Sequence, residues 1–258
     1  MTRVVDDIAE WQRERKLQRR AGLTLGFVPT MGALHEGHLS LVRRSRAEND
    51  RTLVSIFVNR PQFNDAADFE QYPRTYAVDV AMLEREGVEF VIMPTEEQLY
   101  PDGYRYRVSE SDASRRLEGE FRPGHFDGVL TVVLKLLAVA AADRAYFGEK
   151  DWQQLTLVRS MVEAFFLPTA IVGCPTVREP DGLAMSSRNR RLTPADRLKA
   201  ARLYQALSGG GATDDIARVL AAEGFVVDYV ADLEDRRLAA VRLGDVRLID
   251  NVPTRDGS

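Results

Sequence analysis

The sequence predicts an α/β protein in which a doubly wound parallel sheet is followed by a smaller domain. Short apolar runs rich in strand-forming residues alternate with stretches of helical character up to about residue 176. Within this part, Gly128–Ala142 is largely apolar, as expected of a helix buried under a sheet. The alternation then stops, which indicates a change of architecture.

The first domain contains five expected strands separated by helical stretches. The strands are Leu23–Val28, Leu53–Val58, Val88–Met93, Arg144–Phe147 and Ala170–Gly173. Val78, Ala81 and Met82 share one helical face before Gly87, which predicts a helix that ends near this glycine. Because helices separate the strands, the connections are crossovers, and crossovers join parallel strands.

The remaining chain has the pattern of a small α+β domain. A helix is expected at Pro194–Leu207, a break at Gly209–Gly211, and short strands at Phe225–Val230 and Val246–Ile249. We therefore predict two domains, residues 1–176 and residues 177–258.

Composition excludes several classes of protein. The 258 residues are 45% hydrophobic and 29% charged, which rules out disordered and collagen-like chains. A formal net charge of −4 argues against a protein built to bind nucleic acid. There is no apolar stretch of the roughly 18 residues that a membrane crossing needs, and the N-terminus is polar. With a single cysteine, Cys174, no internal disulfide can form, so we expect a cytoplasmic protein with no membrane partner.

Distinctive residues follow three of the expected strands. Pro29–Gly32, Asn59–Phe63 and Gly148–Asp151 each begin where a strand ends. In a parallel sheet these ends lie at one edge, where open α/β sheets bind ligands. The sequence therefore predicts one ligand-binding crevice.

Two of the three histidines, His35 and His38, lie directly after the first expected strand. We expect a tight turn here and a helix that begins near Gly37, with its free N–H groups and both imidazoles facing one point. Such a point suits phosphate, and an imidazolium can stabilise a transferring phosphoryl group. Two alternatives stay open: a metal site completed by His125, and purely structural histidines.

A second candidate cluster is Lys150 with Asp151, a cation for phosphate beside a carboxylate that caps a helix or binds ribose or metal. A third is Ser186, Ser187 and Arg188, which suit a mobile clamp over a triphosphate. A plain surface ion pair remains the alternative for the second cluster.

Gln62 and Gln154 are uncharged amides placed just beyond strands, where they suit a hydroxylated or carboxylate substrate. Buried structural amides are the alternative. No P-loop, G-x-G-x-x-G or G-x-S-x-G sequence occurs, so nucleotidyl transfer is the favoured reaction class.

The chain resembles the pantothenate synthetase (pantoate–β-alanine ligase) family through five motifs that occur in order. The motifs are Pro29–His38, Ser55–Asn59, Tyr72–Thr75, Phe147–Asp151 and Asp181–Asn189. The resemblance runs from about residue 20 to the end of the chain. It implies a Rossmann-like sheet of the nucleotidyltransferase type, which binds nucleotide and pantoate, and a small C-terminal lid domain.

The resemblance also implies an ATP-dependent ligase of pantothenate biosynthesis, which leads to coenzyme A. Pantoate would attack the α-phosphorus of ATP to give pantoyl adenylate and pyrophosphate. β-Alanine would then attack the acyl carbon and release AMP. Mg²⁺ is implied alongside ATP, and a homodimer is implied through the N-terminal domain.

By the same resemblance, catalysis is expected from His38, His35, Lys150 and Arg188, with His38 as the proton donor. The residues expected to contact ATP are Met31, Gly32, His35, Gly37, His38, Gly148, Glu149, Lys150, Asp151, Val177, Met185, Ser186, Ser187 and Arg188. Gln62, Gln154 and Asn59 are expected to bind pantoate and β-alanine, and Asp79 is the expected metal ligand.

The chain departs from the family pattern at two places. Asn59–Phe63 reads Asn-Arg-Pro-Gln-Phe instead of Asn-Pro-Met-Gln-Phe, which adds the cation of Arg60 beside the expected acid pocket. The C-terminal domain is also shortened, because Asp232–Leu238 runs directly into Ala239–Leu243. The first departure leaves open the same ligase chemistry on a different acid or amine. An aminoacyl-tRNA-synthetase-like core and a nucleotide-sensing module also stay open.

Overall fold

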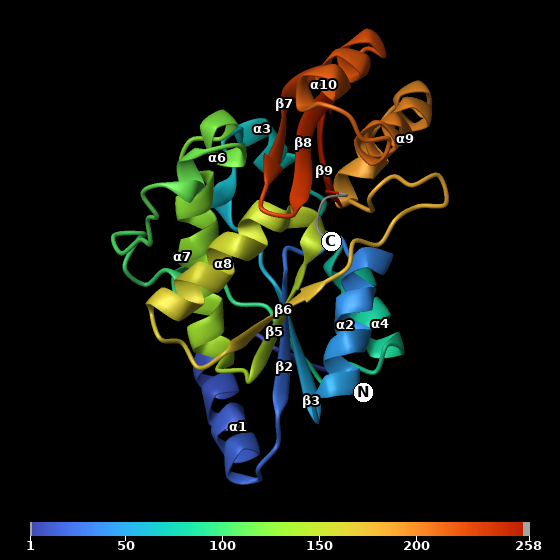
Figure 1. The fold of residues 1–258 in the computed structure, drawn as a ribbon. Helices are drawn as coiled ribbons and strands as arrows, with labels where there is room; N and C mark the ends of the chain where they lie inside the picture. Colours follow the sequence, from blue (N-terminus) through green and yellow to red (C-terminus); the bar gives the residue numbers. More distant parts are fainter. Residues whose placement is uncertain (1, 255–258) are drawn as a thin grey trace. The chain divides into compact units, whose positions relative to one another are not determined.

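The computed structural model describes residues 2–254, and the chain folds as two compact units (Figure 1). The first unit runs to Gly148 and resumes at Gln154–Cys174. The second unit consists of Glu149–Gln153 and the chain from Pro175 onward. The sequence placed Glu149–Gln153 in the first domain, whereas its contacts place this segment in the second unit.

The first unit is built on a six-stranded sheet with strand order β1-β4-β3-β2-β5-β6. All five pairings in it are parallel. The strands are β1 (Arg3–Val5), β2 (Leu25–Thr30), β3 (Arg51–Ile56), β4 (Phe90–Ile92), β5 (Arg144–Gly148) and β6 (Ala170–Cys174). The predicted parallel α/β architecture is confirmed.

Helices cover both faces of this sheet, so it is doubly wound, as predicted. In Figure 1, α2 and α4 lie on one side of the strands, and α1 and α7 lie on the other. The helices of this part of the chain are α1 (Ile8–Arg20), α2 (Glu36–Glu48), α3 (Ala66–Glu70), α4 (Tyr76–Arg85), α5 (Glu96–Leu99), α6 (Glu118–Phe121), α7 (His125–Ala140) and α8 (Trp152–Ala164). Three 3₁₀ turns accompany them: η1 (Arg60–Gln62), η2 (Ala113–Arg115) and η3 (Glu149–Asp151).

The core of the first unit explains why these segments form strands and a buried helix. On the α2 face, Val28, Val54 and Val91 pack against Leu34 and Val42, and all five side chains are buried. On the other side, most residues of α7 are buried, which accounts for its apolar sequence. Burial on both faces removes the alternating pattern from the strands, as expected of a parallel sheet.

Several strand predictions differ from the structure, among them β2, which lies two residues later in the chain than the predicted Leu23–Val28. β1 was not predicted, because it is three residues long and only Val5 is buried, so it carries no apolar run. β3 was predicted to begin at Leu53, but Arg51 and Thr52 already pair with β2. Ladder hydrogen bonds use the backbone, so polar side chains can occupy the start of a strand.

The second unit contains the three-stranded antiparallel sheet β7 (Val226–Leu233), β8 (Arg236–Leu243) and β9 (Val246–Pro253). Two helices, α9 (Pro194–Ser208) and α10 (Thr213–Ala222), and the 3₁₀ turn η4 (Ser187–Arg191) complete it. Leu203, Leu220 and Val241 belong to one buried cluster that joins the helices to the sheet. This unit therefore has a core of its own.

None of the helices within residues 2–254 combines the length and the apolar character that a membrane crossing requires.

Candidate active site

The turn after β2 is held in an unusual backbone conformation. Gly32 and Ala33 both have positive φ angles, +79° and +50°. The hydroxyl of Thr30 donates to the carbonyl of Ser55 at 2.7 Å and accepts from the N–H of Gly32 at 3.1 Å. Positive φ is costly for a non-glycine residue such as Ala33, so other contacts have to stabilise this turn.

Asp79 supplies those contacts from α4. Its carboxylate accepts from the backbone N–H groups of Ala33 and Leu34, both at 2.9 Å. It also accepts from the hydroxyl of Thr75 at 3.1 Å. A Cβ atom on Gly32 would lie 3.0 Å from this carboxylate, so glycine fits best here. With three donors on its two oxygens and 1% of its surface exposed, Asp79 is placed to hold the turn, a role different from the predicted metal ligation.

The turn places His35 and His38 at the start of α2. The helix begins at Glu36, one residue before the predicted Gly37, and His35 is its N-cap. The Nδ1 atom of His35 accepts from the N–H of Gly37 at 3.2 Å. The neutral His35 ring therefore carries its proton on Nε2, where it can donate to a ligand.

The two imidazoles are direct neighbours. Their ring centroids are 4.1 Å apart, and the backbone N–H of His38 donates to the carbonyl of His35 at 2.8 Å. Both residues are partly exposed. Two ring donors and the positive end of a 13-residue helix thus lie together, which is a suitable place for an anion such as a phosphate.

Asn59 and Gln62, two predicted substrate-binding residues, contact one another. The amide nitrogen of Asn59 donates to Oε1 of Gln62 at 3.0 Å and to the carbonyl of Gly128 at 3.1 Å. Gln62 in turn contacts the sulfur of Met31 at 3.1 Å through Nε2. The structure therefore links the residues predicted for substrate to the turn that carries the histidines.

His125 is involved in positioning the backbone of Gln62. Its Nδ1 atom lies 2.8 Å from the carbonyl of Gln62, and its Nε2 atom lies 3.0 Å from the guanidinium of Arg122. A carbonyl only accepts and a guanidinium only donates, so this ring is neutral with its proton on Nδ1. Both ring nitrogens are engaged, which removes the alternative of His125 as a third metal ligand. Within residues 2–254, no group of three or more His, Cys, Asp or Glu side chains is arranged to hold a metal ion.

Gly128 allows α7 to approach η1 closely. A Cβ atom at this position would lie 2.6 Å from the carbonyl oxygen of Pro61 and 2.7 Å from the nitrogen of Gln62. Both are backbone atoms, so they could move aside only if the main chain of η1 shifted. The hydroxyl of Tyr100 donates to Asn59 at 2.7 Å. The sequence does not reveal the roles of Gly128 and Tyr100, because the contacts of both residues join segments that are distant in the chain.

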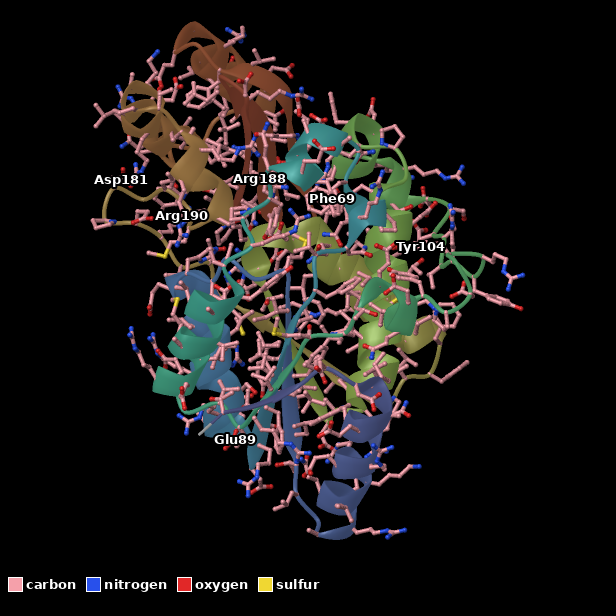
Figure 2. The ribbon with its side chains drawn as sticks, turned by 180° about the vertical axis from the view of Figure 1, so that it is seen from behind. Phe69, Glu89, Tyr104, Asp181, Arg188 and Arg190 are labelled. Atoms are coloured by element: carbon pink, nitrogen blue, oxygen red, sulfur yellow. The ribbon has the colours of Figure 1, made fainter. Side chains whose placement is uncertain are left out.

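Arg60, the extra cation of this chain, lies against an aromatic ring. Its guanidinium carbon is 5.5 Å from the ring centroid of Phe69. Arg60, Phe69 and Tyr104 line a cavity of about 680 Å³ in the first unit. Phe69 and Tyr104 are labelled in Figure 2. The guanidinium of Arg60 is thus held against Phe69.

In the second unit, Asn251 holds the segment that carries Lys150 and Asp151. Its amide nitrogen donates to the carbonyls of Glu149 and Lys150 at 2.8 and 2.9 Å. Arg236 donates to the carboxylate of Glu149 at 2.8 Å and lies 4.4 Å from the ring of Trp152. The Lys150 ammonium is 3.9 Å from the Asp151 carboxylate. The backbone at Lys150 is thus anchored, and its side chain remains partly exposed.

The other predicted ATP contacts of the second unit form one hairpin and the turn that follows it. The N–H of Met185 donates to the carbonyl of Val177 at 3.0 Å, and Arg178 pairs with Ala184. Ser186 then caps η4 by accepting from the N–H of Arg188 at 3.2 Å. Arg188 and Arg190 both extend from this turn, as Figure 2 shows.

The hairpin is fixed to β9 by an ion pair. Arg178 donates to both oxygens of Asp250, at 2.6 and 2.9 Å. Burial raises the pKa of the Asp250 carboxyl group, and the hydrogen bonds and charge of Arg178 oppose this effect. Gly182 completes the turn with φ +93°, where a Cβ atom would lie 2.4 Å from the ring of Tyr204. The hairpin geometry therefore depends on both its charge pair and its glycine.

The predicted residues are divided between the two units. The first unit holds Met31, Gly32, His35, Gly37, His38, Asn59 and Gln62, with Gly148 at the end of β5 and Gln154 on α8, partly exposed. The second unit holds Glu149, Lys150, Asp151, Val177, Met185, Ser186, Ser187 and Arg188.

Comparison with known proteins gives matches over almost the whole chain. The family model for pantoate-β-alanine ligase matches residues 3–253. The pantothenate synthetase of Bdellovibrio bacteriovorus is 53% identical over 252 residues, which are 98% of this chain and 99% of that protein. The pantothenate synthetase of Coxiella burnetii is 52% identical over 253 residues, 98% of this chain and 97% of that protein. A chain of this length is therefore not unusual among these relatives.

Solved structures agree with the sequence matches. The pantoate-β-alanine ligase of Francisella tularensis, solved with β-γ ATP and β-alanine, superposes with a TM-score of 0.94 at 39% identity. The alignment covers 100% of this chain and 99% of that one. The pantothenate synthetase of Thermus thermophilus superposes with a TM-score of 0.87 at 42% identity, covering 98% of this chain and 99% of that one. The resemblance carried by the five motifs is confirmed, and the chain belongs to the pantoate-β-alanine ligase family.

Proposed function

We propose that this chain condenses pantoate with β-alanine to pantothenate in an ATP-dependent reaction that passes through pantoyl adenylate. The observation that carries the proposal is the pair of adjacent imidazoles at the N-terminus of α2, in the same unit as the Asn59–Gln62 amide pair. The Francisella tularensis relative, solved with a form of ATP and β-alanine, supports the choice of substrates.

In the first step, a carboxylate oxygen of pantoate attacks the α-phosphorus of ATP. The new acyl–phosphate bond forms as the bond to pyrophosphate breaks. Negative charge builds on the phosphoryl oxygens, where Nε2–H of His35 and the ring of His38 donate hydrogen bonds. Such preorganised donors commonly contribute ~10²–10³ in rate each.

In the second step, the amine of β-alanine attacks the acyl carbon of the adenylate. The carbon–oxygen bond breaks, AMP leaves with the oxygen that came from pantoate, and the amine nitrogen loses a proton. An acyl adenylate reacts readily with water, so the site has to exclude water between the steps. We assign this exclusion to the second unit, acting as a lid.

Within that unit, Lys150, Ser186, Ser187 and Arg188 are proposed to bind the phosphates of ATP. Their ammonium, hydroxyl and guanidinium groups are the donors that phosphate prefers. The hairpin contact of Met185 with Val177 supports the placement of Ser186, Ser187 and Arg188 on one small scaffold.

Mg²⁺ is proposed to arrive with ATP, because this ion usually stays on substrate phosphates and keeps several waters. When bound, it would neutralise charge on the leaving pyrophosphate. We assign the buried Asp79 carboxylate to the turn, and not to the ion, because three donors of the protein already bind its two oxygens.

We also propose a cytoplasmic homodimer. The family resemblance supports the dimer, and the single buried Cys174 agrees with a reducing compartment. Sedimentation velocity at micromolar concentration would give a species of twice the 29.0 kDa chain mass. A single species of the chain mass would contradict the dimer.

Isotope transfer tests the proposed reaction. Pantoate labelled with ¹⁸O in its carboxylate is incubated with ATP, Mg²⁺ and β-alanine, and the AMP is analysed by mass spectrometry. One ¹⁸O atom in AMP is expected, because the carboxylate oxygen stays on phosphorus. AMP formation without the label would contradict the adenylate route. A lack of AMP formation would contradict the proposal that pantoate and β-alanine are the substrates.

A further inference from the structure

We propose that Tyr100 is a positioning residue for the acid substrate: together with the carbonyl of Gly128, its hydroxyl holds the Asn59 amide in the orientation that sets which end of the Gln62 amide faces the acid. This inference rests on the proposed function, since it assigns the acid-binding role to Gln62. Tyr100 lies just beyond α5, 41 residues from Asn59 in sequence.

The orientation of the Asn59 amide follows from its two neighbours. The carbonyl oxygen of Gly128 can only accept, so the Asn59 atom 3.1 Å away from it is the NH₂ group. The other end is then the oxygen, which lies 2.7 Å from the hydroxyl of Tyr100. This oxygen can only accept, so Tyr100 donates.

The orientation of Gln62 follows in turn. The same NH₂ group of Asn59 lies 3.0 Å from one end of the Gln62 amide, and only an oxygen accepts there. The NH₂ group of Gln62 therefore occupies the other end, 3.1 Å from the sulfur of Met31. A thioether is a weak acceptor, so a substrate oxygen can replace it at little cost.

This orientation matters because the acid substrate is an anion that also carries hydroxyl groups. The NH₂ group donates to carboxylate and hydroxyl oxygens, whereas the reversed amide would place its own oxygen against them. The chain of Tyr100, Asn59 and Gln62 therefore selects for acceptor groups on the ligand.

Tyr100 is well placed to act as a fixed donor. It is 4% exposed, and its ring lies 3.9 Å from that of Tyr104. The ammonium of Lys135 lies 5.0 Å from the Tyr100 ring centroid and 3.1 Å from the carboxylate of Asp102. Burial raises the pKa of the Tyr100 hydroxyl above its ordinary value, which keeps the donor proton in place.

The substitution Tyr100→Phe removes only the hydroxyl and leaves the stacked ring. We expect the KM for pantoate to rise about 10-fold, with the kcat and the KM for ATP changed less than about twofold. Tyr104→Phe is the matched control, because it removes a hydroxyl from the other ring of the same stack. A loss of structure would change all three constants together, so the selective rise identifies positioning.

A second readout needs no substrate. In a ¹⁵N-labelled sample, the side-chain amide signal of Gln62 is identified by its loss in Gln62→Glu. We expect this signal to shift in Tyr100→Phe and to stay in place in Tyr104→Phe. An unmoved signal together with an unchanged KM for pantoate would overturn the inference. If the wild-type protein does not use pantoate, the proposed function fails, but the amide signal still tests the positioning by Tyr100.

The variant Asn59→Asp gives an independent test should Tyr100→Phe fold poorly. The new carboxylate cannot donate to Gln62, so the Gln62 amide should turn and present its oxygen to the acid. A rise in the KM for pantoate larger than that of Tyr100→Phe is expected. An unchanged KM would contradict the role of the amide orientation.

Discussion

The carboxylate of Asp79 accepts a hydrogen bond from the backbone N–H of Leu34 at 2.9 Å, although 45 residues separate them in the sequence. A second bond to the N–H of Ala33 completes a clamp on the turn between β2 and α2. Because this turn ends at His35, α4 determines where the imidazole pair lies. A residue predicted to bind metal is thus placed to support the proposed catalytic turn.

The first prediction concerns Asp79→Asn. The new NH₂ group would face a backbone N–H and leave it without an acceptor, which costs ~1–3 kcal/mol when buried. We expect a lower melting temperature and a lower kcat, with an unchanged Mg²⁺ concentration for half-maximal rate. Glu84→Gln, on the exposed side of α4, is the control. A large increase in the Mg²⁺ requirement at normal stability would instead identify Asp79 as a metal ligand.

The second prediction separates the two roles of His35, as a helix cap and as a phosphate donor. Asparagine is a good N-cap, whereas alanine loses ~0.5–2 kcal/mol at this position. We expect His35→Asn to keep normal stability but to share the low kcat of His35→Ala. Urea unfolding and steady-state kinetics measure both. Full activity in His35→Asn would show that only the cap matters.

The third prediction concerns His38→Ala. The loss of one preorganised donor to the α-phosphate should lower the kcat of adenylation by ~10²–10³ and leave the KM for ATP nearly unchanged. Single-turnover measurement of pyrophosphate release isolates this step. If the rate of release stayed at the wild-type value, His38 would have no part in adenylation.

The sequence predicts the turn of Pro29–His38 well, because a strand, glycines and a helix start lie within one short segment. It does not predict the partners of that turn. The bonds of Asp79 to Leu34 and of Tyr100 to Asn59 join segments that only the folded sheet brings together. Each partner is a common residue type with no local pattern.

The segment Glu149–Gln153 illustrates a second limit. It follows β5 directly, and sequence order assigns it to the first domain. Its backbone carbonyls, however, accept from Asn251 near the end of the described chain. Neither hydrophobic periodicity nor motif spacing predicts a contact between Lys150 and Asn251, which are 101 residues apart.

The fourth prediction concerns acid specificity. Since Arg60 lies against Phe69, it should have no direct part in acid recognition. We expect Arg60→Met to keep the ratio of kcat/KM for pantoate to that for other 2-hydroxy acids within about twofold. Competition assays with paired acids give this ratio. A change of about ten-fold or more would support the alternative that this cation altered the specificity.

The fifth prediction concerns acid stability. Hydrogen bonds from the N–H of Tyr106 and from Lys135 lower the pKa of Asp102 to about 2. The folded value lies below the ordinary value of 3.8, so the carboxylate stabilises the fold above about pH 4. This contribution is lost as the pH falls toward 2. Asp102→Asn should therefore melt below the wild type at pH 5 and approach it near pH 2. A difference that stays constant over this range would contradict the assignment.

In the proposed reaction, ATP activates pantoate before β-alanine takes part. ATP–pyrophosphate exchange with Mg²⁺ and pantoate, in the absence of β-alanine, tests it most directly, with other small hydroxy acids and no acid as comparisons. We expect rapid exchange that requires pantoate. Exchange with another acid in preference to pantoate, or no exchange with any acid, would contradict it.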